Sequence, residues 1–306
     1  MSLLVVGTVA FDAIQTPFGK IDRVIGGSAT YACLSASYYH DKINLVAVVG
    51  EDFPESEINK LQRHHINVDG LQVKQGEKSF FWSGKYHNDM NTRDTLVTEL
   101  NVLEKFDPSI PENYQDCKYL MLGNIAPALQ KLVIERLTKR PKLILMDTMN
   151  FWMDIALEEL KEVIALVDVL SINDEEARQL SGEYSLVKAA KKIMEMGPKN
   201  VIIKKGEHGA LLFNEKQVFF APALPLEEVF DPTGAGDTFA GGFIGYLASK
   251  DDASFENMKR AIIYGSAMAS FCVEKFGPER IESLDSKDLD ERLHQFVDLM
   301  QFEISL

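Results

Sequence analysis

The stretch Asp231-Pro-Thr-Gly-Ala-Gly-Asp-Thr-Phe-Ala-Gly-Gly-Phe243 carries more information than any other part of this 306-residue sequence. It follows an extended, proline-containing segment over 218–224, and a helical pattern begins at Asp237. Glycines allow backbone amides to approach a ligand without a Cβ in the way. A helix N-terminus directs unpaired N–H groups and the positive end of its dipole at one point. The stretch therefore predicts an anion site with Asp237 at its mouth.

An acidic side chain beside an anion site suggests proton transfer. Asp237 can take a proton from a hydroxyl while the amides hold the negative charge that develops, as phosphoryl transfer from a nucleotide to an alcohol requires. The structural alternative is that Thr233 and Gly234 cap a helix and Asp237 only complements its dipole. Two other phosphate motifs are excluded. Phe239 stands where a G-x-G-x-x-G fingerprint needs its third glycine, and the sequence contains no G-x-x-x-x-G-K-[ST].

Composition and length are those of a globular enzyme. Hydrophobic residues make up 46% of the chain, which is long enough for one large α/β domain with an insertion. The net charge of −14 argues against nucleic acid as a partner, because no basic surplus exists to neutralise phosphates. The three cysteines have no C-x-x-C spacing, which favours reduced thiols in the cytoplasm. No apolar run reaches transmembrane length, so no membrane partner is expected.

Short apolar runs alternate with helical patterns along most of the sequence. The runs expected to form buried parallel strands are 3–6, 44–49, 119–122, 143–146, 167–172 and 201–203. The helical patterns between them are 29–39, 55–65, 126–137, 157–166, 175–180 and 186–196. A hairpin is expected over 210–220, and helices over 238–249, 255–274 and 287–300. This alternation predicts an α/β fold, a doubly wound and mostly parallel sheet flanked by helices, in a single domain over 1–306.

Two segments interrupt the alternation, at approximately 13–25 and 78–103. The second reads as two extended arms joined by a polar turn. We expect both segments to form a small β-sheet outside the main core, which needs a partner surface because a sheet of this size is marginal alone. A plain surface hairpin is the alternative. Phe80, Phe81 and Trp82 supply apolar area for either arrangement.

A second group of polar residues follows the first strand. Asp12 comes after the run 3–6, and ligands of open α/β sheets bind beyond the carboxyl ends of strands. A carboxylate there can accept hydrogen bonds from two neighbouring sugar hydroxyls; the alternative is a turn-forming Asp. Gly26-Gly27-Ser28 then opens the helical pattern at 29. The two glycines allow either a close approach of ligand to backbone or a tight turn.

Two further motifs lie at expected strand ends. Asn173 and Glu176 are three residues apart at a strand-to-helix junction, a spacing typical of a capping box. The run Lys204-Lys-Gly-Glu-His-Gly209 follows another strand, where glycines permit a backbone approach to a ring or to phosphates. A simple hairpin turn is the alternative for this run.

Together these motifs resemble the signatures of the PfkB family, the ribokinase-like carbohydrate and nucleoside kinases, over nearly the full chain. The run 231–243 is similar to the C-terminal signature, and Asp12 with Gly26-Gly27 to the N-terminal one. The resemblance implies a ribokinase-like fold whose small sheet is a lid over the sugar, and several members pair through this lid into a homodimer. It implies a kinase that uses ATP and Mg²⁺ to phosphorylate a hydroxymethyl group of a small sugar or nucleoside.

The resemblance also implies roles for individual positions. Asp237 matches the catalytic base, and the anion hole matches Gly234, Ala235 and Gly236, with the amide of Asp237. The positions that match substrate contacts are Asp12, Gly26, Gly27, Ser28, Tyr31 and Asn124. The positions that match nucleotide contacts are Asp147, Asn173, Lys204, Gly206, Gly209 and Ser266. Glu176 matches a residue that orders water around Mg²⁺, and Asp231 and Thr233 match a monovalent-cation (K⁺) site of some members.

The sequence departs from the family pattern at two positions. Tyr31 stands where relatives carry asparagine, and Ser28 where ribokinase carries lysine. If the Tyr31 ring faces the pocket, it offers a stacking surface, so free ribose should be a poorer acceptor than a nucleoside; the ring can instead turn into the core. Two other functions stay open: a regulator that binds sugar or nucleotide without turnover, and a pyrimidine or vitamin kinase of the same superfamily. Asp237 weighs against the first, and Asp12 with its two glycines against the second.

Overall fold

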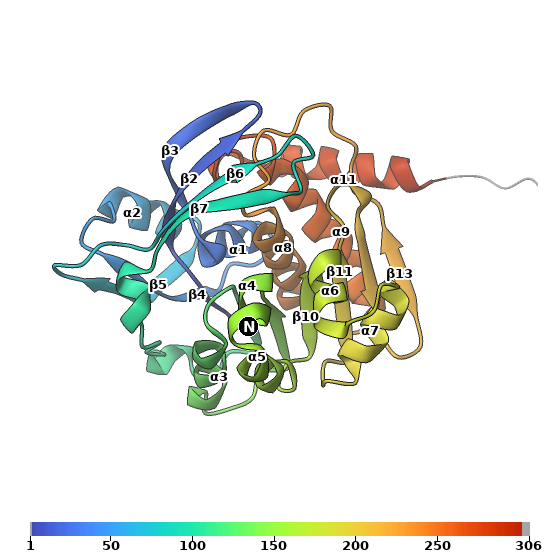
Figure 1. Cartoon of the computed structure of the whole chain (residues 1–306), viewed down its shortest axis with the longest axis horizontal. Coiled ribbons are helices and arrows are strands. Elements are labelled where there is room, and N and C mark those ends of the chain that lie inside the picture. The colour runs from blue at the N-terminus through green and yellow to red at the C-terminus, as the bar shows by residue number, and fades with distance from the viewer. Residues whose placement is uncertain (1, 302–306) are drawn as a thin grey trace, which may run out of the picture.

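The computed structural model describes residues 2–301, and its main feature is a nine-stranded sheet with helices on both faces (Figure 1). Seven strands are parallel, in the order β11-β10-β9-β8-β1-β4-β5, and the hairpin β12–β13 continues the sheet antiparallel at β11. The strands are β1 (Leu3–Val6), β4 (Ile43–Gly50), β5 (Ile66–Lys74), β8 (Tyr119–Leu122), β9 (Leu143–Asp147), β10 (Val169–Asn173), β11 (Asn200–Lys204), β12 (Ala210–Phe213) and β13 (Val218–Ala221). The predicted doubly wound fold is confirmed.

Helices cover both faces of this sheet. They are α1 (Ser28–Ser37), α2 (Glu55–Arg63), α3 (Pro127–Arg136), α4 (Asn150–Ile155), α5 (Leu157–Ile164), α6 (Asp174–Ser181), α7 (Leu186–Met194), α8 (Ala235–Lys250), α9 (Phe255–Cys272), α10 (Glu279–Glu282) and α11 (Ser286–Met300). Short 3₁₀ turns occur at Asn101–Lys105, Glu112–Tyr114 and Gly206–His208. None of the helices within 2–301 is long and apolar enough to cross a membrane.

The core has two halves, one on each face of the sheet. Successive residues of β1 alternate between them: Leu3 and Val5 belong to the half beneath α1, α8 and α9, while Leu4 and Val6 belong to the half beneath α3, α5, α6 and α7. Because both faces are buried, a strand at the centre of the sheet needs apolar residues at every position. This is why the runs of the sequence are continuous instead of alternating.

A second, four-stranded sheet forms the lid, in the order β3-β2-β6-β7 (Figure 1). Its strands are β2 (Ala10–Thr16), β3 (Gly19–Gly26), β6 (Phe81–Tyr86) and β7 (Arg93–Glu99). β2 pairs in parallel with β6, and the other two pairings are antiparallel. The two interrupting segments therefore do form one small sheet, as predicted. The lid begins earlier than expected, and Asp12 lies within its strand β2 and not in a turn.

Three elements were not predicted from the sequence. The edge strand β5 contains Asp69 and Gly70 and lacks a continuous apolar run, because an edge strand is only partly buried. The helices α4 and α10 have six and four residues, too few to display a helical period. The missed helix α4 matters for the site, because it follows β9 directly.

Close helix packing fixes where α8 begins. A Cβ at Gly241 would lie 2.2 Å from the carbonyl oxygen of Ala32, and one at Gly245 2.7 Å from the Cα of Ala36. Both glycines thus let α8 lie directly against α1, closer than any side chain would permit. The N-termini of both helices consequently lie at the carboxyl edge of the sheet, beneath the lid.

Candidate active site

Polar residues end three consecutive strands of the large sheet. Asp147 is the last residue of β9, Asn173 of β10 and Lys204 of β11. Because these strands are parallel, the three side chains meet at one edge. The Nζ atom of Lys204 lies 2.8 Å from Oδ2 of Asp147, and it would lie 3.0 Å from a Cβ on Gly236. The sequence motifs of three separate segments are therefore brought together at the start of α8.

The start of α8 has the geometry of an anion site. Gly234 is the N-cap residue, with a φ of 75° in the left-handed region. The amide of Ala235 donates to the carbonyl of Pro232 (3.2 Å), so it is engaged within the turn. The amides of Gly236 and Asp237 stand in the first helical turn, where the helix itself supplies no carbonyl partner. Of the amides predicted to form the anion hole, that of Ala235 is thus used by the turn, and the anion hole itself stays a prediction.

The surroundings of Asp237 bring its pKa close to neutral pH. Burial and the nearby carboxylate of Asp147 together raise the pKa of Asp237 to about 7, against the opposing charges of Lys204 and Arg93. A general base works best when its pKa is close to the operating pH. Asp237 thus has the ionisation behaviour that its predicted role needs.

Glu176 has a structural role that is visible directly. Its Oε2 accepts from the backbone N–H of Asn173 (2.8 Å), and Oδ1 of Asn173 accepts from the N–H of Glu176 (2.8 Å). The capping box expected from the spacing is therefore confirmed. Burial raises the pKa of Glu176 to about 7, against the opposing charge of Lys204. The cap also fixes the Glu176 carboxylate at the edge of the Lys204–Asp147 pair.

At the other end of the site, Asp12 is held against the two glycines of the N-terminal motif. A Cβ on Gly26 would lie 1.9 Å from Oδ2 of Asp12, and the N–H of Gly27 donates to the Asp12 carboxyl. Burial raises the pKa of Asp12 to about 8, and the carboxylates of Asp231 and Asp237 contribute. Gly27 has a φ of 94°, so it also makes the tight turn into α1. The tight-turn reading of this diglycine is thus confirmed, and the close approach of a ligand to it stays a prediction.

The strand order of the large sheet reverses between β1 and β8. A Cβ on Gly7 or on Gly123 would lie 2.6 Å or 2.8 Å from Oγ of Ser28. Ser28 also exchanges hydrogen bonds with Thr8: its N–H donates to Oγ1 of Thr8 (2.8 Å), and its Oγ accepts from the N–H of Thr8 (3.1 Å). Ser28 therefore joins the end of β1 to α1. Such a switch point is where open α/β sheets bind ligands.

Asn124 follows β8 at this switch point and is held by α4. Its Oδ1 accepts from Nε1 of Trp152 (2.8 Å), and its Nδ2 donates to Sδ of Met149 (2.9 Å). Thioether sulfur is a weak acceptor, so the amide N–H₂ can exchange Met149 for a ligand oxygen. Trp152 and Met149 were missed by sequence reasoning, because α4 itself was not predicted.

Tyr31 is turned into the protein and not into an open pocket. Its side chain is 1% exposed, and a Cβ on Gly234 would lie 2.4 Å from two of its ring carbons. The ring therefore lies beneath the N-cap of α8, and its buried hydroxyl has no hydrogen-bond partner. Burial raises the pKa of Tyr31 well above its usual value, with Asp231 and Asp12 nearby. The prediction that this ring offers an open stacking face is wrong, and the core alternative holds.

The tip of the lid reaches both ends of the site. The hydroxyl of Thr233 donates to the hydroxyl of Tyr86 (3.2 Å), which joins β6 to the turn before α8. A Cβ on Gly206 would lie 2.4 Å from Oδ1 of Asn91, so the lid turn also touches the loop after β11. Arg93 pairs directly with Tyr86 across β6–β7, and such pairs project to one face. Arg93 therefore projects from the same face of the lid as Tyr86, which contacts Thr233.

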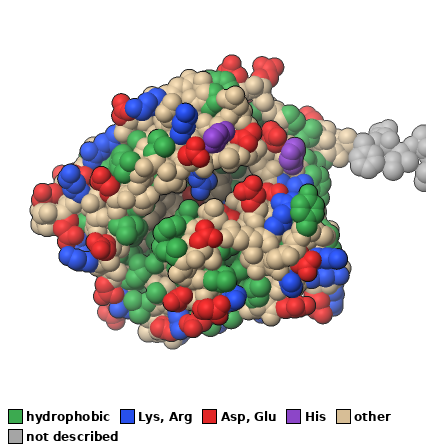
Figure 2. Space-filling model, in the orientation of Figure 1, with side chains coloured by type: hydrophobic (Ala, Val, Ile, Leu, Met, Phe, Trp, Pro, Cys, Tyr) green, Lys and Arg blue, Asp and Glu red, His purple; other side chains and the backbone are tan. Residues whose placement is uncertain are grey.

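Arg93 was missed by sequence reasoning. Its charge lowers the pKa of both Asp237 and Glu176, which belong to different helices, so its guanidinium is near both. The signal that could have found it is the hairpin register, since the polar turn between the two arms sets Arg93 opposite Tyr86. In Figure 2 the surface is hollowed beneath the lid, and basic side-chain atoms are visible within the hollow.

Asp231 joins the motif to the loop before α10. Its Oδ1 accepts from the N–H of Thr233 (2.9 Å) and its Oδ2 from the N–H of Gly277 (2.9 Å). The side chain is fully buried, and within residues 2–301 it has no salt bridge to a Lys or Arg. Burial raises the pKa of Asp231. Its negative charge is thus compensated by two backbone amides and the side chain of Thr233.

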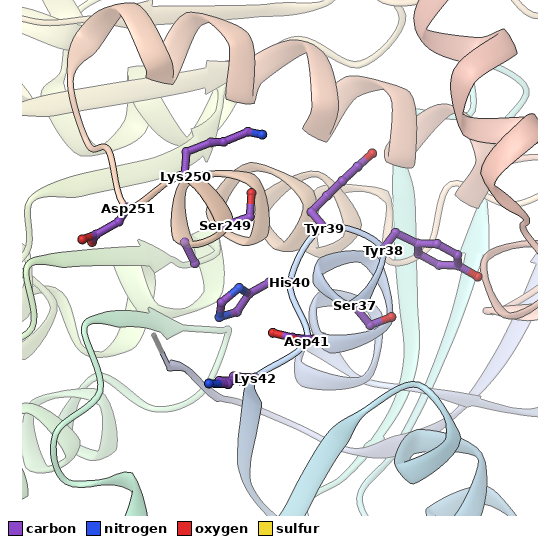
Figure 3. A pocket seen from close by; sticks show the side chains of 10 residues that line it. Ser37, Tyr38, Tyr39, His40, Asp41, Lys42, Ser249, Lys250 and Asp251 are labelled. Carbon is purple, nitrogen blue, oxygen red and sulfur yellow. The ribbon is translucent and has the colours of Figure 1, made fainter.

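Some predicted contacts are not brought to the cluster. Gly209 serves the chain turn, since a Cβ there would lie 2.1 Å from the carbonyl oxygen of Ala221. Ser266 is buried within α9, and among residues 2–301 no hydrogen bond links it to the cluster. A cavity of about 720 Å³ lies at the opposite ends of α1 and α8, lined by residues 37–42 and 248–251 (Figure 3). None of the predicted site residues lines this cavity.

Comparisons with known proteins identify the family to which the chain is similar. Residues 2–284 match the family model described as pfkB family carbohydrate kinase. The cytidine kinase of Thermococcus kodakarensis is 32% identical over 250 residues, which cover 80% of this chain and 87% of that protein. The nucleoside kinase of Methanothermobacter thermautotrophicus is 26% identical over 309 residues, covering 90% and 91%. A crystal structure of an E. coli protein assigned as ribokinase II, in complex with ATP and Mg²⁺, superposes with a TM-score of 0.78 at 21% identity, covering 97% of this chain and 99% of that one.

Proposed function

This chain belongs to the pfkB family of carbohydrate kinases, a phosphotransferase family with alcohol acceptors, and we propose that it transfers the γ-phosphoryl group of ATP to a hydroxymethyl group of a nucleoside or small sugar. The observation that supports this best is the meeting of Asp237, Lys204 and Asp147 at the N-terminus of α8. It combines a carboxylate poised to take a proton with backbone amides and a cation that can hold a phosphoryl group.

In the proposed reaction, Asp12 holds acceptor hydroxyls and Asp237 accepts the proton of the hydroxymethyl group. The acceptor oxygen bonds to phosphorus as the bond between the β–γ bridging oxygen and phosphorus breaks. The amides of Gly236 and Asp237 receive the equatorial oxygens. In this chemistry the protein contributes mostly position and charge. The lid contacts the two ends of the site through Tyr86 and Asn91, and its closure over bound substrates would keep water from the transferred group.

The residues present fit a magnesium ion held indirectly. Within residues 2–301 no three His, Cys, Asp or Glu side chains are grouped so that they could hold a metal ion by themselves. Mg²⁺ usually keeps several waters and binds through one or two carboxylates and substrate phosphates. Glu176 and Asp147 are the carboxylates at this edge that can accept from such waters. When bound with ATP, the ion would offset negative charge on the phosphates.

Trp82 supports a nucleoside over a free sugar as the acceptor. It pairs with Asp12 across the parallel strands β2 and β6, so both side chains project to the same face of the lid. Its ring lies over Gly84, where a Cβ would be 2.1 Å from it. This aromatic surface beside Asp12 replaces the one that Tyr31 was expected to offer. The two relatives reported above are named as kinases of nucleosides.

We expect kcat/KM to be about 2- to 13-fold higher for the best nucleoside than for ribose, because base stacking is worth roughly 0.5–1.5 kcal/mol beyond the area buried. ADP release with ATP and a panel of pentoses, hexoses and nucleosides measures this. Trp82→Ala should remove most of the advantage, while Trp82→Phe, which keeps a ring, should retain part of it. Ribose outperforming every nucleoside would contradict the acceptor class, and absence of turnover with the whole panel would contradict the kinase itself.

A monovalent cation beside Asp231 stays a prediction. Asp231 is a buried carboxylate without a cationic partner in the described residues, and such a charge is costly unless it is compensated. At ten times its Kd, K⁺ would stabilise the protein by about 1.4 kcal/mol, which raises Tm by about 2–4 °C. Melting curves in KCl and in choline chloride at equal ionic strength test this, with Asp231→Asn as the control. If Tm is equal in KCl and in choline chloride, K⁺ does not bind beside Asp231.

Homodimerisation through the lid also stays a prediction. All seven residues of the edge strand β7 are exposed, among them the apolar Leu96 and Val97. An exposed strand edge with apolar side chains is a ready surface for pairing with a second copy. Light scattering after gel filtration should then give twice the monomer mass of 34.3 kDa, and Leu96→Asp should shift it toward the monomer. A monomer at all concentrations would exclude this interface.

A further inference from the structure

The helix α4, which the sequence patterns did not predict, holds the side chain of Asn124. The indole Nε1–H of Trp152 donates to Oδ1 of Asn124 (2.8 Å), and Nδ2 of Asn124 donates to Sδ of Met149 (2.9 Å). Both partners belong to the segment that follows β9, whereas Asn124 follows β8. Since β8 and β9 are neighbours in the sheet, the two segments meet at adjacent strand ends.

Gln130 on α3 fixes the backbone of the two segments that meet here. Its Nε2 donates to the carbonyl of Gly123 (2.9 Å) and to the carbonyl of Asp147 (3.1 Å), and its side chain is fully buried. The loop that carries Asn124 is thus tied to the end of β9 independently of Trp152. What Trp152 adds is control over the rotation of the Asn124 side-chain amide.

The amide of Asn124 has nearly the same shape in two orientations, which exchange its oxygen and its N–H₂ group. The indole N–H of Trp152 can only donate, so it pairs only with the orientation that places Oδ1 toward it. The opposite orientation would set two donors against each other and leave both without that bond. Trp152 therefore selects one orientation of the amide.

The selected orientation leaves Asn124 with a donor to offer. Its amide carries two N–H bonds, and among residues 2–301 only one of them has a hydrogen-bond partner, the thioether of Met149. Sulfur is a weak acceptor, so a ligand oxygen can replace it. Asn124 is also partly exposed, which leaves its N–H₂ group open to a ligand.

The neighbours of Asn124 connect it to Asp12, the residue proposed to hold hydroxyls of the alcohol substrate. A Cβ on Gly123 would lie 2.8 Å from Oγ of Ser28, so these two residues are in contact. Ser28 follows directly on Gly26-Gly27, against which Asp12 is held. The N–H₂ group of Asn124 and the carboxyl group of Asp12 thus border the same end of the site.

We propose that Trp152 is a positioning residue that determines which kind of polar group Asn124 recognises on the alcohol substrate; this rests on the kinase function proposed above. Because Trp152 holds Oδ1, Asn124 presents N–H and selects a substrate with a lone pair at that point. An ether, hydroxyl or carbonyl oxygen and a ring nitrogen meet this requirement. An amino group there would face a second donor and be rejected.

The first test compares the wild-type protein with Trp152→Phe, which removes the N–H and keeps a ring. Without the indole donor the amide can turn, and a neutral hydrogen bond contributes about 2- to 13-fold. We expect Trp152→Phe to raise the KM of the best alcohol substrate by this factor, while kcat and the KM of ATP change by less than twofold. An unchanged KM of the alcohol, or an equal change in the KM of ATP, would overturn the proposal.

The variant Asn124→Asp tests the polarity directly. Aspartate keeps the shape of asparagine and still accepts from Trp152, but it has no N–H to offer. It should therefore raise the KM of the alcohol substrate at least as much as Asn124→Ala does. Wild-type affinity in Asn124→Asp would show that this N–H does not hold the substrate, and would overturn the proposal.

A double-mutant cycle determines whether Trp152 acts through Asn124. In the Asn124→Ala background, Trp152→Phe should raise the KM of the alcohol substrate no further, because the amide that Trp152 orients is absent. The same increase in both backgrounds would mean that Trp152 acts independently of Asn124, which would overturn the proposal.

Gln179 on α6 offers a matched control for a merely loosened α4. Its Nε2 donates to Oδ1 of Asp154 (2.7 Å), an exposed hydrogen bond between α6 and α4. Gln179→Ala removes this bond without touching Asn124 and should leave the KM of the alcohol substrate unchanged. An increase equal to that of Trp152→Phe would overturn the proposal. Melting curves establish that all variants are folded before the kinetics are compared.

A spectroscopic measurement is independent of turnover. The chain contains two tryptophans, so ¹⁵N-labelled protein gives two indole N–H signals, and Trp152→Phe identifies which one belongs to Trp152. A hydrogen-bonded N–H exchanges with water slowly. The Trp152 indole proton should therefore exchange more slowly in the wild-type protein than in Asn124→Ala. Equal rates would show that Asn124 does not hold this N–H, and would overturn the proposal.

The kinase function and the role of Trp152 fail in different ways. If the wild-type protein phosphorylates no alcohol, the kinase function falls, while indole exchange and calorimetric titration of nucleosides still decide the role of Trp152. If the wild-type protein turns over and Trp152→Phe has the same KM for the alcohol, the kinase function stands and the role of Trp152 falls.

Discussion

Asp237→Asn is expected to lower kcat by about 10²–10⁴-fold, the usual contribution of a positioned general base. Asparagine keeps the size and the helix position of Asp237 but cannot accept the proton of the hydroxyl. Nucleotide binding should change little, because the amides of Gly236 and Asp237 belong to the backbone. Steady-state kinetics with the best acceptor, together with calorimetric titration of ADP, measure both effects.

The pH dependence gives this prediction a second measurement. Because the pKa of Asp237 is raised to about 7, the carboxyl group is increasingly protonated below that pH and cannot act as a base. Wild-type kcat/KM should therefore fall as the pH decreases through about 7, whereas the residual activity of Asp237→Asn should lack this limb. Near-normal turnover in the variant would show that Asp237 is not the base. It would favour the alternative in which Asp237 only complements the dipole of α8.

At about pH 9, where the Asp12 carboxyl with its pKa of about 8 is ionised, Asp12→Ala is expected to raise the KM of the acceptor by about 10- to 150-fold, since a hydrogen bond to a charged partner contributes roughly 1.5–3 kcal/mol. The KM of ATP should change by less than threefold, because Asp12 lies on the lid strand β2 beside Gly26 and Gly27, away from Lys204 and Asp147. Measuring both constants at saturating levels of the other substrate separates these effects. Equal changes in both would indicate that Asp12 only supports the fold.

Asp12→Asn provides a control that separates binding from stability. The pKa of Asp12 is raised to about 8, so the folded protein binds this proton more tightly than the unfolded chain does. Ionisation of Asp12 therefore costs stability, and the cost grows as the pH rises from about 4 to about 8. Asp12→Asn should raise Tm relative to wild type at about pH 8, and by less at about pH 5, while acceptor binding weakens. A lower Tm at both values would contradict a destabilising buried charge.

Several local features around the site were predictable from the sequence, because each depends on a short motif. Asp237 and Gly234 stand in one continuous run, and the spacing of Asn173 and Glu176 defines a capping box that the structure realises. Helix caps and left-handed glycines depend on a few neighbouring residues, so a linear pattern specifies them. The lid hairpin was found for the same reason, since its second arm alternates.

Other parts depend on contacts between distant segments. Tyr31 was expected at the pocket because of its place in a motif, yet its ring lies beneath Gly234, a residue about two hundred positions away. Nothing local determines whether a helical aromatic side chain faces a ligand or a neighbouring helix. Arg93 reaches Asp237 and Glu176 only because the lid folds back over the large sheet.

The sequence by itself determined the doubly wound α/β fold, the lid and the glycine-capped start of the helix that carries Asp237, because periodicity, capping and glycine placement act over a few residues. Only the tertiary structure decided which charges meet. Asp147 and Lys204 end two strands that lie on either side of β10, so they form an ion pair although they are 57 positions apart in sequence. Their partnership follows from the order of the strands, and that order is set by burying both faces of the sheet, which no local pattern records.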